Sequence, residues 1–399
     1  MRRKSGRASG PQSVAGDGVA AIVLALGCVS ACGQSGPSPI GMEQLGASTY
    51  IPVLAGHPDG TIFAANLQQS GMQESAAAWR IRPDGGRAWT RTYDEAIVPI
   101  PSWLATSPWA ADAPLIVGGG KSVTKLSASG ERLWTAACAS WSCDPNSQRS
   151  PQVAATADGG ALVVADDNRL IRLSAADGTV AWTSTAPQDA VCSPGFSLQT
   201  IAEAADGTVL LGGGASSRCD GTATAIGLTI LRLDSTGRHI GGRTLHPADD
   251  QSGGVLVGLS VAPDGSILVN GYFSGTVDFG DGSGTDVLTA STDGASFAMK
   301  MAPDFSLERV SEAPMVSMMA ATSDGGLLGI DHRGSIGKGQ AADPHLVKLD
   351  ADLRLEWDVT VADAASTVYG AAVAGNRVAV AGFGRIGEYY GTFVSRYRF

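Results

Sequence analysis

Three aspartates in a glycine-rich segment are the residues of this sequence best placed to bind a metal ion. Asp278, Asp281 and Asp286 lie close together in the sequence, and carboxylate oxygens on such a loop could hold Ca²⁺. Their spacing does not follow the EF-hand pattern, which needs ligands at alternating positions and a glutamate at position twelve. A solvated turn is therefore the alternative interpretation. We expect no other metal and no bound cofactor.

Other side chains that could bind a ligand are basic or aromatic. They are Arg218, Tyr272, His332, Arg333, Tyr389 and Tyr390. The basic members could bind an anion, and the two adjacent tyrosines could form a platform for a carbohydrate or a peptide. Solvated surface positions and packing at the ends of loops are the alternative interpretations of these residues.

The sequence does not predict a catalytic residue. Of the five histidines, only His332 falls in a segment expected to be a long loop, so a multi-histidine metal centre is not expected. The sequence has no Gly-x-Ser-x-Gly elbow, no HExxH motif and no phosphate-binding glycine loop. Its many serines and aspartates leave an acid–base pair open as an alternative.

Residues 1–31 have the features of the signal peptide of an exported lipoprotein. A basic segment precedes an apolar run that is too short to span a membrane. The run ends in Val29-Ser30-Ala31-Cys32, which resembles the bacterial lipobox, and Cys32 would be the lipidated first residue of the mature chain. A secreted protein that loses Cys28 and Cys32 with its signal is the alternative. Gly33 stands where an aspartate would retain a lipoprotein in the inner membrane, so we expect the outer membrane, on its periplasmic or its exposed side.

The segment that follows the lipobox predicts a tether, and the charge of the mature chain limits its partners. Residues 32–40 are rich in Gly, Ser and Pro, as in flexible linkers, which leaves 41–399 for the folded domain. Loss of residues 1–31, with four basic residues and one aspartate, changes the formal charge from −10 to −13. This charge disfavours nucleic acid and anionic lipid as ligands. We expect a monomer with a lipid anchor and a protein or carbohydrate partner.

The remaining cysteines predict disulfides. Cys138, Cys143, Cys192 and Cys219 make an even number in an exported chain, which is typical of disulfide bonding. The pairs Cys138–Cys143 and Cys192–Cys219 are preferred because each closes a local loop, and the other two connectivities stay open.

An internal repeat predicts the elements that would position these residues. A tight Asp-Gly turn between two apolar runs recurs about every 50 residues. The first copy is Asp59-Gly60, the last is the variant Gly375-Asn376, and a degenerate copy lies near Asp112-Ala113. A second turn in each repeat leads into a fourth strand that often carries Trp. Asp-Gly signals a hairpin because glycine adopts a positive φ without steric cost. Seven such units predict an all-β protein with one β-propeller of seven four-stranded blades, and six to eight blades stay open.

Composition and the two ends of the domain agree with a closed ring. With 53 glycines and 17% charged residues among 399, the chain does not resemble a coiled coil or a disordered protein. The last repeat stops at Phe399 after its third strand, and residues 42–48 precede the first strand of the first repeat. We therefore expect this N-terminal segment to complete the last blade and to remove its free edge.

The connections of unequal length predict a binding face. In a propeller, the connections between the second and third strands share one face with those between blades. All long segments belong to that face, here named the long-loop face: 66–76, 139–150, 213–226, 273–295, 331–344 and 384–391. Elaborated loops on a rigid scaffold are where binding residues usually lie, so we expect the ligand there.

Two segments of the repeats resemble known propeller families. The turn Ala176 to Trp182 is similar to the repeats of quinoprotein-like (PQQ-type) propellers, and Gly271 to Gly280 is similar to the SBBP repeats of secreted bacterial proteins. The resemblance implies the fold and structural tryptophans that pack between blades. Quinoprotein dehydrogenases have a vicinal disulfide over the cofactor, and this sequence has no adjacent cysteines. The PQQ-like lipoprotein that acts as an outer-membrane assembly scaffold is the closer analogue.

These observations together predict a binding or scaffold module without catalytic activity. An exported hydrolase or lyase that acts on a sugar or lactone is the alternative. A quinone-dependent oxidoreductase is a third reading.

Overall fold

The structure, a computed structural model, is described over most of the chain. The described residues are 37–46, 53–70, 73–94, 101–110, 114–119, 121–141, 151–165, 169–185, 196–216, 226–245, 252–280, 284, 286–290, 294–313, 317–332, 344–361, 367–386 and 389–399. Within these ranges the chain forms strands and tight turns, apart from one short 3-10 helix, η1 (Cys138–Ser140). None of these residues forms a helix long and apolar enough to cross a membrane.

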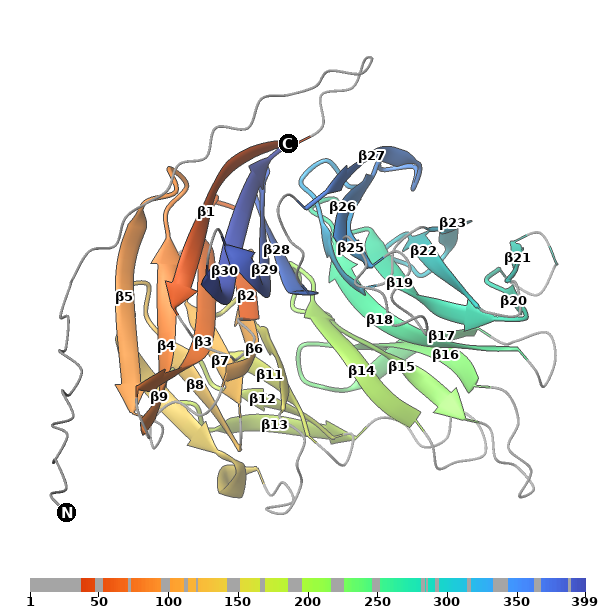
Figure 1. Cartoon of the computed structure of the whole chain (residues 1–399). Coiled ribbons are helices and arrows are strands. Elements are labelled where there is room, and N and C mark those ends of the chain that lie inside the picture. The colour runs from red at the N-terminus through yellow and green to blue at the C-terminus, as the bar shows by residue number, and fades with distance from the viewer. Residues whose placement is uncertain are drawn as a thin grey trace, which may run out of the picture.

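Seven four-stranded antiparallel sheets form a ring, so the protein is a seven-bladed β-propeller, as predicted (Figure 1). From the innermost strand outward, blade 1 consists of β2 (Val53–Gly56), β3 (Ile62–Ser70), β4 (Gln73–Ile81) and β5 (Arg87–Asp94). Blade 2 consists of β6 (Pro101–Thr106), β7 (Leu115–Gly119), β8 (Ser122–Leu126) and β9 (Arg132–Ala137). Blade 3 consists of β10 (Gln152–Ala155), β11 (Ala161–Val164), β12 (Arg169–Leu173) and β13 (Val180–Thr185). Blade 4 consists of β14 (Phe196–Glu203), β15 (Val209–Ser216), β16 (Ile226–Leu233) and β17 (His239–Leu245).

The remaining blades follow the same order. Blade 5 consists of β18 (Gly253–Val261), β19 (Ile267–Ser274), β22 (Ala295–Met301) and β23 (Leu307–Glu312). Blade 6 consists of β24 (Ser317–Ala321), β25 (Leu327–His332), β26 (Pro344–Leu349) and β27 (Leu355–Thr360). Blade 7 is β28 (Thr367–Ala374), β29 (Arg377–Ile386), β30 (Tyr389–Arg398) and β1 (Ser38–Gly46). Each innermost strand contacts that of the next blade, and β28 contacts β2, which closes the ring.

The two ends of the domain meet in blade 7, as the sequence predicts. β1 pairs with β30, from Ser38 opposite Arg398 to Gly46 opposite Thr392. Residues 38–40 of the expected tether therefore belong to this strand. The pairing gives the last blade its fourth strand and leaves no unpaired edge on β30.

The core lies between blades. One cluster joins Leu162 and Leu170 of blade 3 to Leu211 and Leu231 of blade 4, all almost fully buried. Because each sheet buries both faces against its neighbours, a blade cannot bury its apolar side chains alone.

Tryptophans of the fourth strands link blades 1, 2 and 3 each to the next blade. The Trp134 Nε1–H of blade 2 donates to the carbonyl of Ala175 in blade 3 at 3.1 Å. Its ring lies against Gly178 of the same turn, where a Cβ atom would be 2.7 Å from Cε3. The same donation joins Trp89 to Ala128 (2.7 Å) and Trp182 to Ser235 (2.9 Å). The structural role predicted for these tryptophans is confirmed.

A basic side chain of the third strand supports each of the first two links. Arg80, opposite Trp89, donates to the same Ala128 carbonyl at 3.0 Å. Lys125, opposite Trp134, donates to its acceptor carbonyl at 3.0 Å as well. One carbonyl thus receives two donors from the preceding blade, which fixes the angle between the two sheets.

Two of the long segments expected on the long-loop face are tight hairpins instead. Over 66–76 the ladder of β3 and β4 continues to Ser70 opposite Gln73, and Leu67 lies buried opposite Ala76. Over 384–391 the ladder of β29 and β30 continues to Ile386 opposite Tyr389. Polar and glycine residues suggested loops, but cross-strand hydrogen bonding extends through them, which corrects the prediction for both segments.

The segment 273–295 does carry an insertion. Its strands β20 (Thr276–Asp278) and β21 (Val287–Thr289) form a separate two-stranded sheet, here named the arm, which projects from blade 5 (Figure 1). Arg243 of β17 holds its base by donating to the carbonyls of Phe279 at 2.9 Å and Gly280 at 2.5 Å. The other long segments lie partly outside the described residues.

Candidate functional site

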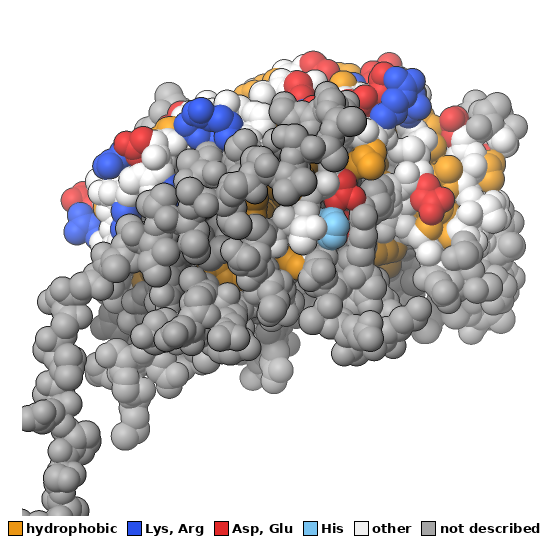
Figure 2. All heavy atoms as spheres, turned by 45° about the horizontal axis from the view of Figure 1, so that its top comes forward, with side chains coloured by type: hydrophobic (Ala, Val, Ile, Leu, Met, Phe, Trp, Pro, Cys, Tyr) orange, Lys and Arg blue, Asp and Glu red, His pale blue; other side chains and the backbone are white. Residues whose placement is uncertain are grey.

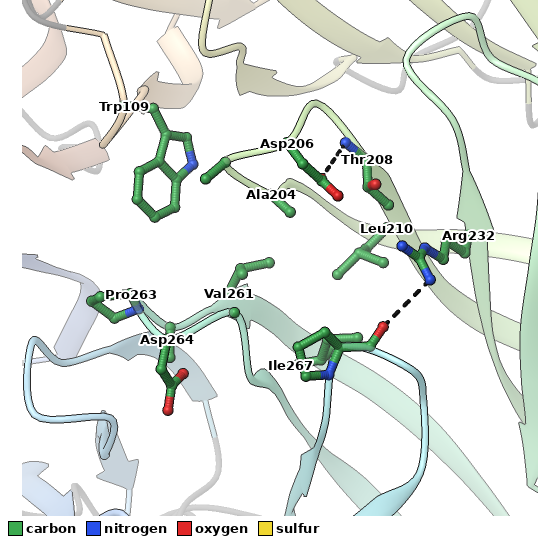
Figure 3. Close-up of a pocket in the computed structure, with 14 residues that line it drawn as sticks. Trp109, Ala204, Asp206, Thr208, Leu210, Arg232, Val261, Pro263, Asp264 and Ile267 are labelled. Atoms are coloured by element: carbon green, nitrogen blue, oxygen red, sulfur yellow. Dashed lines mark hydrogen bonds between the residues drawn. The ribbon is translucent and has the colours of Figure 1, made fainter.

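A pocket of about 280 Å³ lies where blades 4 and 5 meet (Figure 3). The turns that line it join first to second and third to fourth strands, so it lies on the face opposite the long-loop face. We name this face, formed by the turns between first and second and between third and fourth strands, the turn face. The floor of the pocket is apolar, with Leu210 of β15, Val261 of β18 and Ile267 of β19. Trp109 forms a wall on one side and Arg232 stands on the other.

Trp109 reaches this pocket from blade 2, two blades away. It lies in the turn between β6 and β7, where its backbone N–H donates to Ser107 Oγ at 3.3 Å. In blade 1 the equivalent donor is Asp59, whose N–H lies 3.4 Å from His57 Nδ1. Trp109 therefore occupies the position that an aspartate holds in other blades. Its indole Nε1–H donates to the Glu203 carbonyl at the end of β14, at 3.4 Å, which places the ring beside blade 4.

Glu203, whose carbonyl accepts the Trp109 hydrogen bond, is held in a buried ion pair. The Glu203 side chain is 1% exposed, accepts from Arg172 Nη1 at 2.8 Å, and accepts from the backbone N–H of Ala157 at 2.5 Å. Burial raises the pKa of Glu203 despite these bonds. Arg172 also pairs with Asp158 at 3.1 Å. Blades 3 and 4 are thus joined directly behind the wall of the pocket.

The pocket opens at a blade interface that lacks the indole link. In blade 3, Trp182 lies opposite Arg172, but in blade 4 the residue opposite Arg232 is Gly241. Among the described residues, apart from its chain neighbours, no atom lies within 4 Å of where the Gly241 Cβ would be. Arg232 instead donates from Nη1 to the Pro303 carbonyl of blade 5 at 3.4 Å. Phe305 holds the turn position that Gly237 has in blade 4, and its ring centroid lies 6.0 Å from Arg232 Cζ at this interface.

The rim of the pocket carries fixed negative charge. Asp206 accepts the backbone N–H of Thr208, and Asp264 accepts that of Ser266, each at 2.9 Å. These backbone hydrogen bonds are the largest cause of the lowered pKa of both carboxyl groups, so both are ionised at neutral pH. Arg232 balances part of this charge. In the view of Figure 2, acidic and basic side chains stand next to one another along the upper edge of the molecule.

The size of the pocket determines what it can hold. The volume of about 280 Å³ lies at the lower end of the range of about 300–1,000 Å³ that is usual for small-molecule and cofactor sites. An apolar floor with an indole wall fits an aromatic or branched side chain, and the acidic rim fits a neighbouring basic group.

Tyr272 is the predicted ligand residue whose surroundings are best described. It lies on β19, half-buried, and burial together with the charge of Asp331 raises the pKa of its hydroxyl to about 12. Asp331 lies on β25 of the next blade and is 3% exposed. The phenol is therefore neutral at physiological pH and packs toward the interface of blades 5 and 6.

The aspartates of the arm make backbone hydrogen bonds. The Asp278 carboxylate accepts the N–H groups of Gly280 at 2.8 Å and Gly284 at 3.1 Å. The Asp286 carboxylate lies near the same Gly280. Among the described residues no group of three His, Cys, Asp or Glu side chains could hold a metal ion. Asp281 lies outside these residues, so the Ca²⁺ site stays an untested prediction.

The other predicted residues are placed only in part. Arg218, Arg333, Cys32, Cys143, Cys192 and Cys219 lie outside the described residues. His332 ends β25, and Tyr389 and Tyr390 begin β30, but only their backbone is described. Cys138 is buried in η1 and is disulfide-bonded, while its pairing stays a prediction.

Sequence reasoning missed the pocket because its walls come from three blades. The one signal was the degenerate second repeat, which was placed near Asp112-Ala113. In the structure its turn begins at Ser107, and Trp109 replaces the aspartate. A large aromatic residue in a turn that elsewhere carries Asp-Gly indicates a contact outside its own blade.

Comparisons with known proteins agree with the fold. Residues 80–293 match the family model described as outer membrane protein assembly factor BamB. Among solved structures, the Cps50 (Swd1) β-propeller domain of Myceliophteria thermophila is similar with a TM-score of 0.57 and 8% identity, over 91% of this chain and 100% of that chain. BamB from Moraxella catarrhalis is similar with a TM-score of 0.48 and 14% identity, over the same shares. A comparison with curated proteins found no match.

Proposed function

The chain belongs to the family described as outer membrane protein assembly factor BamB, and on this premise we propose that it is a non-enzymatic scaffold anchored to the outer membrane. In this proposal residues 1–31 are removed and Cys32 carries the acyl chains. Several acyl chains make such an anchor stable, whereas a single chain gives marginal binding. The propeller acts as a monomer and holds a protein partner.

The observation that carries the proposal is the pocket on a rigid ring. The side chain of Trp109 is fixed by Glu203, which is itself held in the ion pair between blades 3 and 4. A preformed pocket loses little entropy when it accepts a partner side chain. We propose that a partner inserts an aromatic or branched side chain over Leu210 and Ile267, with a basic neighbour at the rim. The long-loop face and its arm provide the second contact surface.

Photo-crosslinking at single positions tests which surface binds the partner. A photoreactive amino acid at Ala205, exposed at the rim of the pocket, should give a defined crosslinked protein in envelope preparations. At Thr289 of the arm it should trap a partner on the long-loop face. Ser129 is an exposed turn residue of blade 2 and serves as the matched control. Trp109→Ala should reduce the product at Ala205 and leave that at Thr289.

Two outcomes would contradict the proposal. Equal products at Ala205 and Ser129 would show that crosslinking reports exposure and not docking. The anchor is tested separately: Cys32→Ser should move the protein from the membrane fraction to the soluble fraction, and retention in the membrane fraction would refute lipidation at this residue.

A further inference from the structure

The chain enters the propeller at one corner of the turn face. Ser38, the first residue of β1, pairs with Arg398 near the end of the chain, and the Phe399 N–H donates to the Asn376 carbonyl at 3.1 Å. Cys32 precedes Ser38 by six residues, and six extended residues reach at most about 22 Å. A lipid anchor on Cys32 therefore keeps the junction of blades 7 and 1 within that distance of the bilayer.

Arginines gather at the same junction. We name them the seam cluster: Arg82, Arg87, Arg377, Arg396 and Arg398. Turns of two blades bring them together, because Arg377 Nη1 would be 2.8 Å from a Cβ at Gly60, and Arg396 Nη1 would be 2.2 Å from one at Gly85. Arg82, Arg87 and Arg398 are exposed. The opposing charges of these turns are those of Asp59 and Asp84.

The other side of the turn face carries charges of both signs, with Arg238, Arg309 and Arg354 exposed there. Each described turn of blades 4 to 6 on this face contains an aspartate: Asp206, Asp234, Asp264, Asp304, Asp324 and Asp350. The turn between β28 and β29 at the seam contains none, since it reads Gly375-Asn376. A domain with a net charge of −13 would be repelled as a whole by an anionic surface. It can approach one only with the seam cluster foremost.

We propose that the seam cluster is a membrane-docking surface that binds the phosphate groups of anionic lipid headgroups. The inference rests on the anchor of the proposed function, because the anchor brings this corner to the membrane. Each guanidinium group can donate two parallel hydrogen bonds to two oxygens of one phosphate group. Arg82 is free to do so, since its bond to Asp84 (3.4 Å) joins two side chains that are each more than half exposed. Acyl chains and basic cluster then act as two signals that fix orientation as well as attachment.

This orientation has a consequence for the pocket. The seam lies against the bilayer, so blades 4 and 5 lie on the far side of the ring from the membrane contact. The pocket and the long-loop face stay open to a partner in the aqueous phase. The net charge of the whole domain disfavours anionic lipid, and the proposal restricts lipid binding to this corner.

Vesicle binding by the mature chain with Cys32→Ser tests the proposal without the anchor. At low ionic strength it should bind phosphatidylcholine vesicles that contain about 30% phosphatidylglycerol, and not pure phosphatidylcholine vesicles. The triple variant Arg82→Gln, Arg87→Gln, Arg398→Gln should lower the partition coefficient roughly 100-fold, since each arginine contributes about fivefold. Added salt should release the unsubstituted chain in the same way.

A second triple variant controls for net charge. Arg238→Gln, Arg309→Gln and Arg354→Gln remove three exposed arginines from the opposite side of the turn face and should leave binding unchanged. Equal loss in both triple variants, or no preference for phosphatidylglycerol, would overturn the proposal. Fractionation of Cys32→Ser in cells reports on the anchor alone, so failure of the anchor and failure of the docking surface give different results.

Discussion

The contact between Trp134 and Gly178 allows a direct test of what holds the blades together. Gly178 has a φ of +73°, and a Cβ there would lie 2.7 Å from Trp134 Cε3. Gly178→Ala therefore adds two costs, an unfavourable backbone conformation and an overlap with a ring that is 6% exposed. Gly284 has a φ of +78°, and no atom of the described part of the chain lies within 4 Å of its Cβ position. Gly284→Ala adds the backbone cost alone and is the matched control.

The structure gives the size of each cost. An alanine in the left-handed region loses about 1–2 kcal/mol. Overpacking a buried site costs about 1–3 kcal/mol, and displacing the indole loses the 3.1 Å bond to Ala175, which contributes about 1 kcal/mol. We expect Gly178→Ala to lower the free energy of unfolding by roughly 4 kcal/mol, and Gly284→Ala by roughly 1 kcal/mol.

Urea unfolding followed by circular dichroism measures both values. In the background Trp134→Leu the added methyl group meets no ring, so Gly178→Ala should cost less than it does alone, which a double-mutant cycle detects. Equal losses for Gly178→Ala and Gly284→Ala would refute the reasoning. Equal losses would mean that the Trp134 indole moves aside at no cost in free energy and does not hold the neighbouring blade in place.

Two further predictions concern closure of the ring and its ion pairs. Deletion of residues 38–46 leaves the outer edge of β30 unpaired and should abolish folding or sharply lower the thermal midpoint. An unchanged melting curve would contradict the closure by β1. Asp324 is hydrogen-bonded to Lys348, Thr322 and the Gly326 N–H, and although burial opposes them these bonds lower its pKa below 3.8. Its contribution to stability is present above that pH and is lost as the pH falls through the folded value. Asp324→Asn should therefore lower the thermal midpoint at neutral pH but not well below pH 3.8, and an equal effect at both would contradict the ion pair.

The ring was predictable from the sequence because each copy of the repeat contains the same turn and strand residues at the same spacing. An Asp-Gly turn fixes one hairpin, and a Trp three or four residues after the next turn fixes the link to the following blade. The closure by β1 followed from counting strands at Phe399. Both predictions depend on interactions within a repeat or between neighbours, which sequence spacing describes well.

Lengths of hairpins and the position of the pocket were not predictable in this way. The ladder through Ser70 and Gln73 continues because cross-strand bonds and the buried Leu67 outweigh local turn propensity. The pocket forms only where Trp109, Asp206 and Asp264 come together from three blades. The spacing of residues in the sequence does not indicate which turns meet near the centre of the ring. A site built from distant repeats appears only when the ring is closed.

The departures from the repeat nevertheless gather around the pocket. Trp109 replaces the turn aspartate in blade 2, Gly241 replaces the fourth-strand tryptophan in blade 4, and the arm is inserted into blade 5. Arg243, two residues beyond Gly241, carries the link instead, with donation to the Phe305 carbonyl of blade 5 at 3.0 Å. Regular positions of the repeat are needed to hold neighbouring blades, so a change there loses stability unless another contact replaces it. Here Arg232 and Arg243 replace the indole link that blade 4 lacks, and the ring stays closed. This is the arrangement expected if blades 2, 4 and 5 supply the binding site and the remaining blades position it.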